Sequence, residues 1–159
     1  MHGPLVILLL CIVATIVAAP DNDVCTNAID IDLLCDAKPR VLDVSTFSAS
    51  NYPRPATCNS YYTPSGPAVW YKFTVTQPSN VAITVLGCNA SAAHELGLGF
   101  AIFTEDCDHL VCFKTSGRYC YKNMTGMEAG AYYLYIGTFL EEGMDFKLMA
   151  VCYPPPQGV

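Results

Sequence analysis

Two histidines are the side chains outside the amino-terminal leader that could act as a general base. His94 stands beside Glu95, and His109 follows Asp108 in an acidic stretch. Hydrolysis needs an activated nucleophile or a facing carboxylate pair, held within hydrogen-bond reach of the base. The sequence has no Gly-x-Ser-x-Gly elbow, and no spacing that gives either histidine a partner. We therefore predict that both histidines are surface or strand-end residues and that the chain is not an enzyme, with a hydrolase as a remote alternative.

Carboxylates gather at Glu105, Asp106 and Asp108, around Cys107. Carboxylate oxygens are the ligands that Ca²⁺ prefers, but a calcium ion needs about six or more of them around one point. Even with Glu95 nearby, four scattered carboxylates beside a cysteine are more typical of a solvated turn. The sequence therefore predicts no metal and no cofactor, with Glu105, Asp106 and Asp108 as weak candidates for a cation site.

Aromatic side chains offer a different chemistry, the stacking of a ligand. Alternation along Ala68–Thr76 places Trp70 on the face opposite Tyr71 and Phe73, where an exposed indole could stack on a sugar ring. The alternative is a central strand that is buried on both faces. For the tyrosines of the long connection, the alternative is that they cover one end of the fold. The candidate ligand-binding residues are Trp70, Tyr133 and Tyr135 on strands, and Tyr52, Tyr61 and Tyr62 on the connection Ser48–Pro67.

The cysteines indicate how such residues would be held in place. Cys11 lies in the apolar leader, and the remaining eight are Cys25, Cys35, Cys58, Cys88, Cys107, Cys112, Cys120 and Cys152. An even set in a short exported chain is typical of a disulfide framework, and no Cys-x-x-Cys spacing favours the alternative, zinc. Eight cysteines allow about a hundred pairings. A short Cys107–Cys112 loop and a bond from Cys152 to the amino-terminal part are two hypotheses among them.

The leader itself is an uncharged apolar run over residues 4–19 that ends in two alanines. Such a run is typical of a secretory signal peptide, and it falls short of the ~20 residues that span a bilayer. We predict a signal peptide over 1–19, a folded domain over 20–153 and a Pro-rich tail over 154–159. The product would be secreted, without membrane insertion after cleavage; an uncleaved signal anchor is the alternative.

The charge of the chain restricts its partners. The formal net charge is −6, and no run of Lys and Arg is present. Nucleic acid is therefore excluded as an expected partner, because phosphate binding needs clustered basic residues. Two Asn-x-Ser/Thr sequons, at Asn89 and Asn123, are glycosylation candidates in a eukaryotic secretory pathway and predict surface positions.

Short β-branched and aromatic runs, separated by Pro, Gly, Asn, Asp and Ser clusters, recur through the rest of the chain. They predict strands over Ala28–Leu33, Val41–Phe47, Ala68–Thr76, Val81–Gly87, Gly99–Thr104, His109–Lys114, Arg118–Met124, Ala131–Thr138 and Met144–Cys152. No segment shows an apolar stripe of helical period. The sequence therefore predicts an all-β fold, a two-sheet β-sandwich or jelly roll of about eight or nine short strands stapled by disulfides.

Four motifs occur in a recognisable order: N-D-V-C-T-N-A, G-P-A-V-W-Y-K-F, an apolar strand that runs into a cysteine, and G-A-Y-Y-L-Y-I-G. They span Asn22–Ala28, Gly66–Phe73, Phe100–Cys107 and Gly130–Gly137. This pattern resembles that of the bacterial pre-peptidase C-terminal domain family. The resemblance implies a non-catalytic β-sandwich module of exported and cell-surface proteins.

The chain departs from the family pattern where acidic loop residues are usual. Ala68 stands where those modules have Asp, and Phe113 and Lys114 stand where an acidic pair follows the cysteine. These departures lower the expectation of bound calcium. The function that we predict is a secreted binding or adhesion module for carbohydrate or an extracellular protein surface. The alternative is a structural protein of an extracellular matrix or coat that acts through self-association.

Overall fold

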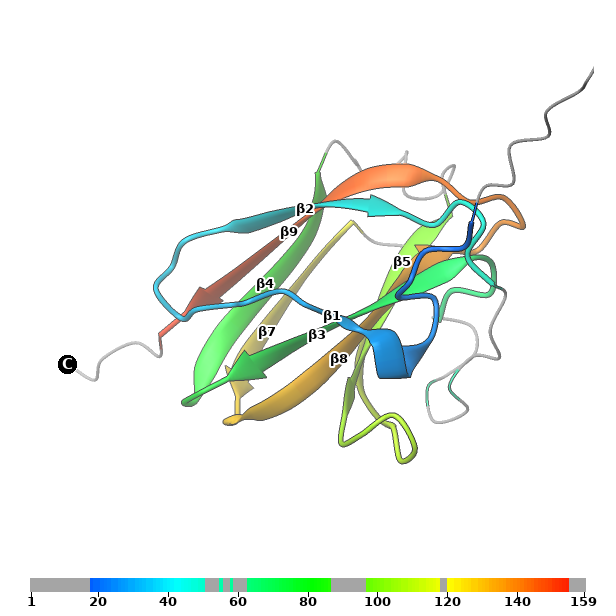
Figure 1. Ribbon diagram of the computed structural model, residues 1–159. Coiled ribbons are helices and arrows are strands. Elements are labelled where there is room, and N and C mark those ends of the chain that lie inside the picture. The colour runs from blue at the N-terminus through cyan, green and yellow to red at the C-terminus, as the bar shows by residue number, and fades with distance from the viewer. Residues whose placement is uncertain are drawn as a thin grey trace, which may run out of the picture.

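The strands of the protein follow the alternating segments of its sequence. The computed structural model describes residues 18–50, 55, 58, 63–86, 97–117 and 120–154, which form nine strands and one short 3-10 helix (Figure 1). The elements are η1 Cys25–Asn27, β1 Ile29–Asp30, β2 Arg40–Ser45, β3 Ala68–Val75, β4 Ser79–Leu86, β5 Leu98–Thr104, β6 Val111–Gly117, β7 Tyr121–Met127, β8 Gly130–Thr138 and β9 Asp145–Tyr153. In this part of the chain, no helix is long and apolar enough to cross a membrane.

The strands lie in two sheets that face each other (Figure 1). One sheet has five strands in the order β1-β3-β8-β5-β6, and the other has four in the order β2-β9-β4-β7. The pair β1–β3 is parallel and the other paired strands are antiparallel. The predicted all-β, two-sheet sandwich with disulfides is confirmed.

Strand β3 shows how alternation fills the space between the sheets. Val69, Tyr71, Phe73 and Val75 point into the central core, and none of them is more than 5% exposed. Burying a side chain of this size stabilises the fold by roughly 1.5–3 kcal/mol. Alternation in β3 therefore fixes which face of the five-stranded sheet turns inward, and it places Trp70 on the outer face.

Strand β1 is shorter than the sequence predicts. Ile29 and Asp30 pair with β3, and the amide of Ile31 still donates to the carbonyl of Lys72 at 2.9 Å. Asp32 then takes a left-handed φ of 52°, which an extended strand does not allow. The chain leaves the sheet at this point, and Leu33 turns into the core instead.

Two glycines let β3 and β8 meet closely at one end of the five-stranded sheet. A Cβ atom on Gly66 would lie 1.8 Å from the carbonyl oxygen of Leu140, and one on Gly137 would lie 2.5 Å from the Cβ of Ala68. Real Cβ atoms do not approach so closely, so both positions require glycine. Both belong to the motifs that carry the family resemblance.

Candidate functional site

Trp70 lies on the outer face of the five-stranded sheet, as its alternation predicts, but it is buried. Its side chain is 1% exposed, and its ring centroid lies 4.9 Å from that of Tyr135 and 5.7 Å from that of Phe103. Stacking on a sugar needs an exposed ring face. The interpretation of Trp70 as an exposed stacking platform is therefore wrong. The alternative, burial on both faces, holds at Trp70, whereas Lys72 and Thr74, further along the same face of β3, are exposed.

A second apolar layer covers this outer face. It consists of the buried residues Cys25, Cys58, Ala68, Trp70, Ala101, Phe103 and Tyr135. Two disulfides hold its cover in place: Cys25–Cys107 fastens η1 to the segment after β5, and Cys58–Cys112 fastens the long connection to β6. Segments that are remote in the sequence therefore cover a face that would be exposed in an isolated strand.

Of the other aromatic candidates, two lie on β8 and three lie outside the described residues. Tyr133 and Tyr135 share the outer face, but Tyr135 is 1% exposed, so it cannot contribute to an exposed strip. Tyr133 is partly buried and packs against the second layer. Tyr52, Tyr61 and Tyr62 lie outside the residues that the structure describes, as do the catalytic candidate His94 and the sequon residue Asn89.

The disulfides correct one pairing hypothesis and confirm the other. A Cys107–Cys112 bond is wrong, because each of these cysteines crosses to another segment. Cys152 does bond back to the amino-terminal part, to Cys35. Cys120 is disulfide-bonded as well, whereas Cys88 lies outside the described residues.

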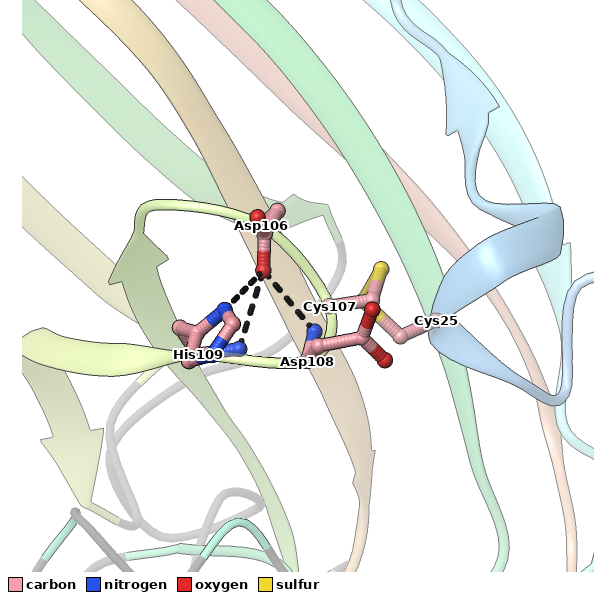
Figure 2. The surroundings of a disulfide bond; sticks show 5 residues. All are labelled: Cys25, Asp106, Cys107, Asp108 and His109. Carbon is pink, nitrogen blue, oxygen red and sulfur yellow. Dashed lines mark hydrogen bonds and ion pairs between the residues drawn. A yellow bond between two sulfur atoms is a disulfide. The ribbon is translucent and has the colours of Figure 1, made fainter.

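The acidic turn after β5 is built around the carboxylate of Asp106. Its Oδ1 atom accepts hydrogen bonds from the backbone amides of Asp108 and His109, each at 3.0 Å, and lies 3.1 Å from Nδ1 of His109 (Figure 2). These bonds, with the His109 side chain as the largest cause, lower the pKa of Asp106 below its ordinary value of 3.8. Asp106 therefore fixes the conformation of the turn. The side chains of Glu105 and Asp108 are exposed to solvent.

The tip formed by residues 105–111 projects beyond the lower edge of the sandwich as the yellow-green connection in Figure 1. Glu105 turns the chain out of β5 with a left-handed φ of 69°. Glu105, Asp108 and His109 are exposed, and Val111 is 46% exposed. The tip thus presents carboxylates beside an apolar side chain on a segment that disulfides anchor at Cys107 and Cys112.

A cleft of about 280 Å³ lies beside this tip, where η1 and the Cys25–Cys107 bond approach β3 and β8. Its polar lining comes from Thr26, Lys72, Tyr133, Asp106 and Asp108. Thr26 and Lys72 are not among the site residues that the sequence predicts. The position of Lys72, two residues beyond Trp70 on the same face, is visible in the alternation of β3. The position of Thr26 depends on the Cys25–Cys107 pairing, which the sequence leaves open.

The acidic residues that the structure describes do not assemble into a metal site. Within the described part of the chain, no three His, Cys, Asp or Glu side chains form a group that could hold a metal ion. His109 contacts one carboxylate, that of Asp106, and both side chains are more than two-thirds exposed. Among the described residues, His109 therefore has one carboxylate within ion-pair distance, and its ring stands in solvent.

No family model matches the sequence, and no curated protein matches it either. Solved structures do match. The periplasmic g-type lysozyme inhibitor PliG of Aeromonas hydrophila has a TM-score of 0.50 at 9% identity, covering 79% of this chain and 95% of that one. This match shows a shared fold.

A pre-peptidase C-terminal domain, from the collagenase of Bacillus anthracis, also matches, with a TM-score of 0.46 at 17% identity over 79% of this chain and 93% of that one. PliG of Salmonella Typhimurium matches with a TM-score of 0.38 at 9% identity, covering 79% and 99%. The family that the sequence motifs resemble is thus among the structural matches.

Proposed function

We propose that the chain is an exported, non-catalytic module that binds an extracellular protein through the tip formed by residues 105–111. The observation that carries this proposal is the construction of the tip. It projects from the sandwich, and it is fixed by the Cys25–Cys107 and Cys58–Cys112 bonds and by the hydrogen bonds to Asp106. A segment that is already ordered loses little conformational entropy on binding, which favours affinity.

The charge of the tip indicates the chemistry of the partner. The exposed carboxylates of Glu105 and Asp108 lie on a chain with a net charge of −6. Complementary charge accelerates encounter and suppresses wrong partners. The expected partner is therefore a protein with a basic surface, and Val111 adds an apolar contact at the edge of the tip.

A chain with the same fold provides a precedent for a protein partner. The Aeromonas protein is a lysozyme inhibitor, so this fold can act on another protein. Carbohydrate recognition through Trp70 is not part of the proposal, because that ring is buried.

Export is the second part of the proposal. The Cys25–Cys107, Cys35–Cys152 and Cys58–Cys112 bonds need an oxidising compartment, which supports a cleaved signal peptide over 1–19, a folded domain over 20–153 and a tail over 154–159. Amino-terminal sequencing of the secreted protein should give a start near residue 20. A product that retains residues 1–19 would contradict cleavage.

The binding proposal is tested with purified extracellular proteins that span acidic to basic isoelectric points and include a g-type lysozyme. Affinity is measured by calorimetry at low and physiological salt, for the parent and for Asp108→Lys. Glu141→Lys is the matched control, since it makes the same charge change on the β8–β9 connection, at the other end of β8. Asp108→Lys leaves in place the backbone amide that bonds to Asp106.

We expect a basic member of the panel to bind, more weakly as salt rises, and Asp108→Lys to reduce its affinity at least about tenfold, or 1.4 kcal/mol. Glu141→Lys should change the affinity much less. Equal losses in the two variants would show a general charge effect and overturn the assignment to the tip. If instead the protein binds nothing and sediments as an oligomer, the structural, self-associating alternative replaces this proposal.

A further inference from the structure

The outer face of the four-stranded sheet differs from that of the five-stranded sheet, because no second apolar layer of described residues covers it. Strand register aligns Val41 of β2, Met149 of β9, Thr84 of β4 and Tyr121 of β7 in one row across this face. Val41 is 51% exposed and Tyr121 is 52% exposed at the two ends of the row. Three of the four side chains in this row are apolar, so the row offers a surface on which a covering group can pack.

The sequon residue Asn123 lies on this same face, next to the row. It pairs with Ala82 of β4, and it follows Tyr121 by two positions along β7. Met124, between the sequon's Asn and Thr, points inward and is 2% exposed. The alternation of the strand therefore directs Asn123 and Thr125 to solvent, and both are exposed.

The surroundings of Asn123 can accommodate a sugar. Strand β7 is an edge strand, and the neighbour across it, Ala82, is small. Tyr121 presents a half-exposed ring on the same face, two residues away, which is the spacing at which side chains of a strand lie side by side. An aromatic ring in this position can pack against the apolar C–H face of a sugar.

We propose that Asn123 carries an N-linked glycan whose first sugar packs on Tyr121 and covers the apolar row of the four-stranded sheet. The donor is a lipid-linked oligosaccharide with a diphosphate at C1 of its first N-acetylglucosamine. The side-chain amide nitrogen of Asn123 forms the bond to C1, the C1–oxygen bond to the diphosphate breaks, the lipid diphosphate leaves, and the amide releases one proton. The inference does not rest on the proposed binding function of the tip.

Occupancy is tested on the full chain secreted from a eukaryotic host, in an Asn89→Gln background that leaves Asn123 as the sequon under study. Peptide mass spectrometry after treatment with peptide N-glycosidase is expected to show Asn123 converted to Asp. Asn123→Gln and Thr125→Ala should each give the unmodified peptide. Secreted, folded protein with an unmodified Asn123 would overturn the proposal.

Packing on Tyr121 is tested by the change in melting temperature when the glycan is removed enzymatically. We expect removal to lower the melting temperature and to increase retention on a hydrophobic resin in the parent. Tyr153→Ala, which truncates another exposed tyrosine, should keep both effects, whereas Tyr121→Ala should abolish the drop in melting temperature. Equal drops in the two variants would show that the sugar does not pack on Tyr121, and unchanged retention in the parent would show that it does not cover the row.

Discussion

Asn22 and Trp70, 48 residues apart in the sequence, exchange two hydrogen bonds. The backbone amide of Trp70 donates to the carbonyl of Asn22 at 2.7 Å, and Nδ2 of Asn22 donates to the carbonyl of Trp70 at 2.8 Å. Asn22 is 4% exposed, so both bonds are shielded from water. They attach the segment before η1 to β3, and in this chain they join the Asn-Asp-x-Cys motif to the Val-Trp-Tyr motif.

Replacing Asn22 with Ala should lower the free energy of unfolding by about 1–3 kcal/mol, because the buried carbonyl of Trp70 loses its partner. Asn27→Ala is the control, since Asn27 is exposed at the end of η1. Urea denaturation, followed by the fluorescence of the single tryptophan, measures both variants. Equal stability of the two variants would contradict the importance of the Asn22 side chain.

Gly137→Ala should destabilise the protein by about 1–3 kcal/mol or more, because the new methyl group would lie 2.5 Å from the Cβ of Ala68. Gly130, at the other end of the same strand, offers the control. A Cβ there would meet Tyr132 at 3.9 Å, which is ordinary contact. Thermal unfolding of the two variants should separate them clearly, and a tolerated Gly137→Ala would disprove the close approach of β3 and β8.

Trp70 also provides an optical probe of the second apolar layer. In the native protein its emission should be blue-shifted and resistant to iodide quenching, because the ring is 1% exposed. Replacing Cys25 and Cys107 together with Ser removes a bond that closes a separation of 82 residues, worth about 4–5 kcal/mol on the chain-entropy model. We expect the emission of this variant to shift to the red and iodide to quench it. Emission and quenching identical to the parent's would show that η1 stays in place without the bond.

The acidic turn should respond to pH through Asp106. Its pKa is lowered in the folded protein, so its hydrogen bonds are fully present above the ordinary value of 3.8 and are lost as the pH falls through the lower, folded value. The amide resonances of Asp108 and His109 should therefore move in NMR spectra as the pH is lowered past 3.8. Asp106→Asn keeps an oxygen acceptor but does not titrate, so it should abolish this movement; if the resonances still move, another group is responsible.

The strands were predictable because their signal is local. All nine predicted strands are present among the described residues, since alternation such as Val69, Tyr71, Phe73 and Val75 reports directly on a half-buried sheet. The early end of β1 was not predictable, because it depends on the left-handed φ of Asp32. Aspartate is compatible with several backbone conformations, so the residue type does not indicate this angle.

The candidate site was harder to predict because it is made of remote contacts. Alternation placed Trp70 on the correct face, but exposure depends on what lies above that face. Part of the cover comes from the segment around Cys25, held by the Cys25–Cys107 bond and by the Asn22–Trp70 hydrogen bonds, and part comes from Cys58, which is bonded to Cys112. The sequence leaves about a hundred pairings open. A surface that depends on one particular disulfide pairing therefore has no signal in the local sequence.

The position of the last two strands has a consequence for biosynthesis. β8 lies in the middle of the five-stranded sheet, and β9 lies between β2 and β4. Until β8 and β9 have been synthesised, each sheet lacks one of its interior strands. The core closes only when the carboxyl-terminal residues have emerged and Cys152 can reach Cys35. For a chain exported as we propose, this topology would place the completion of the core after the carboxyl-terminal residues have been translocated.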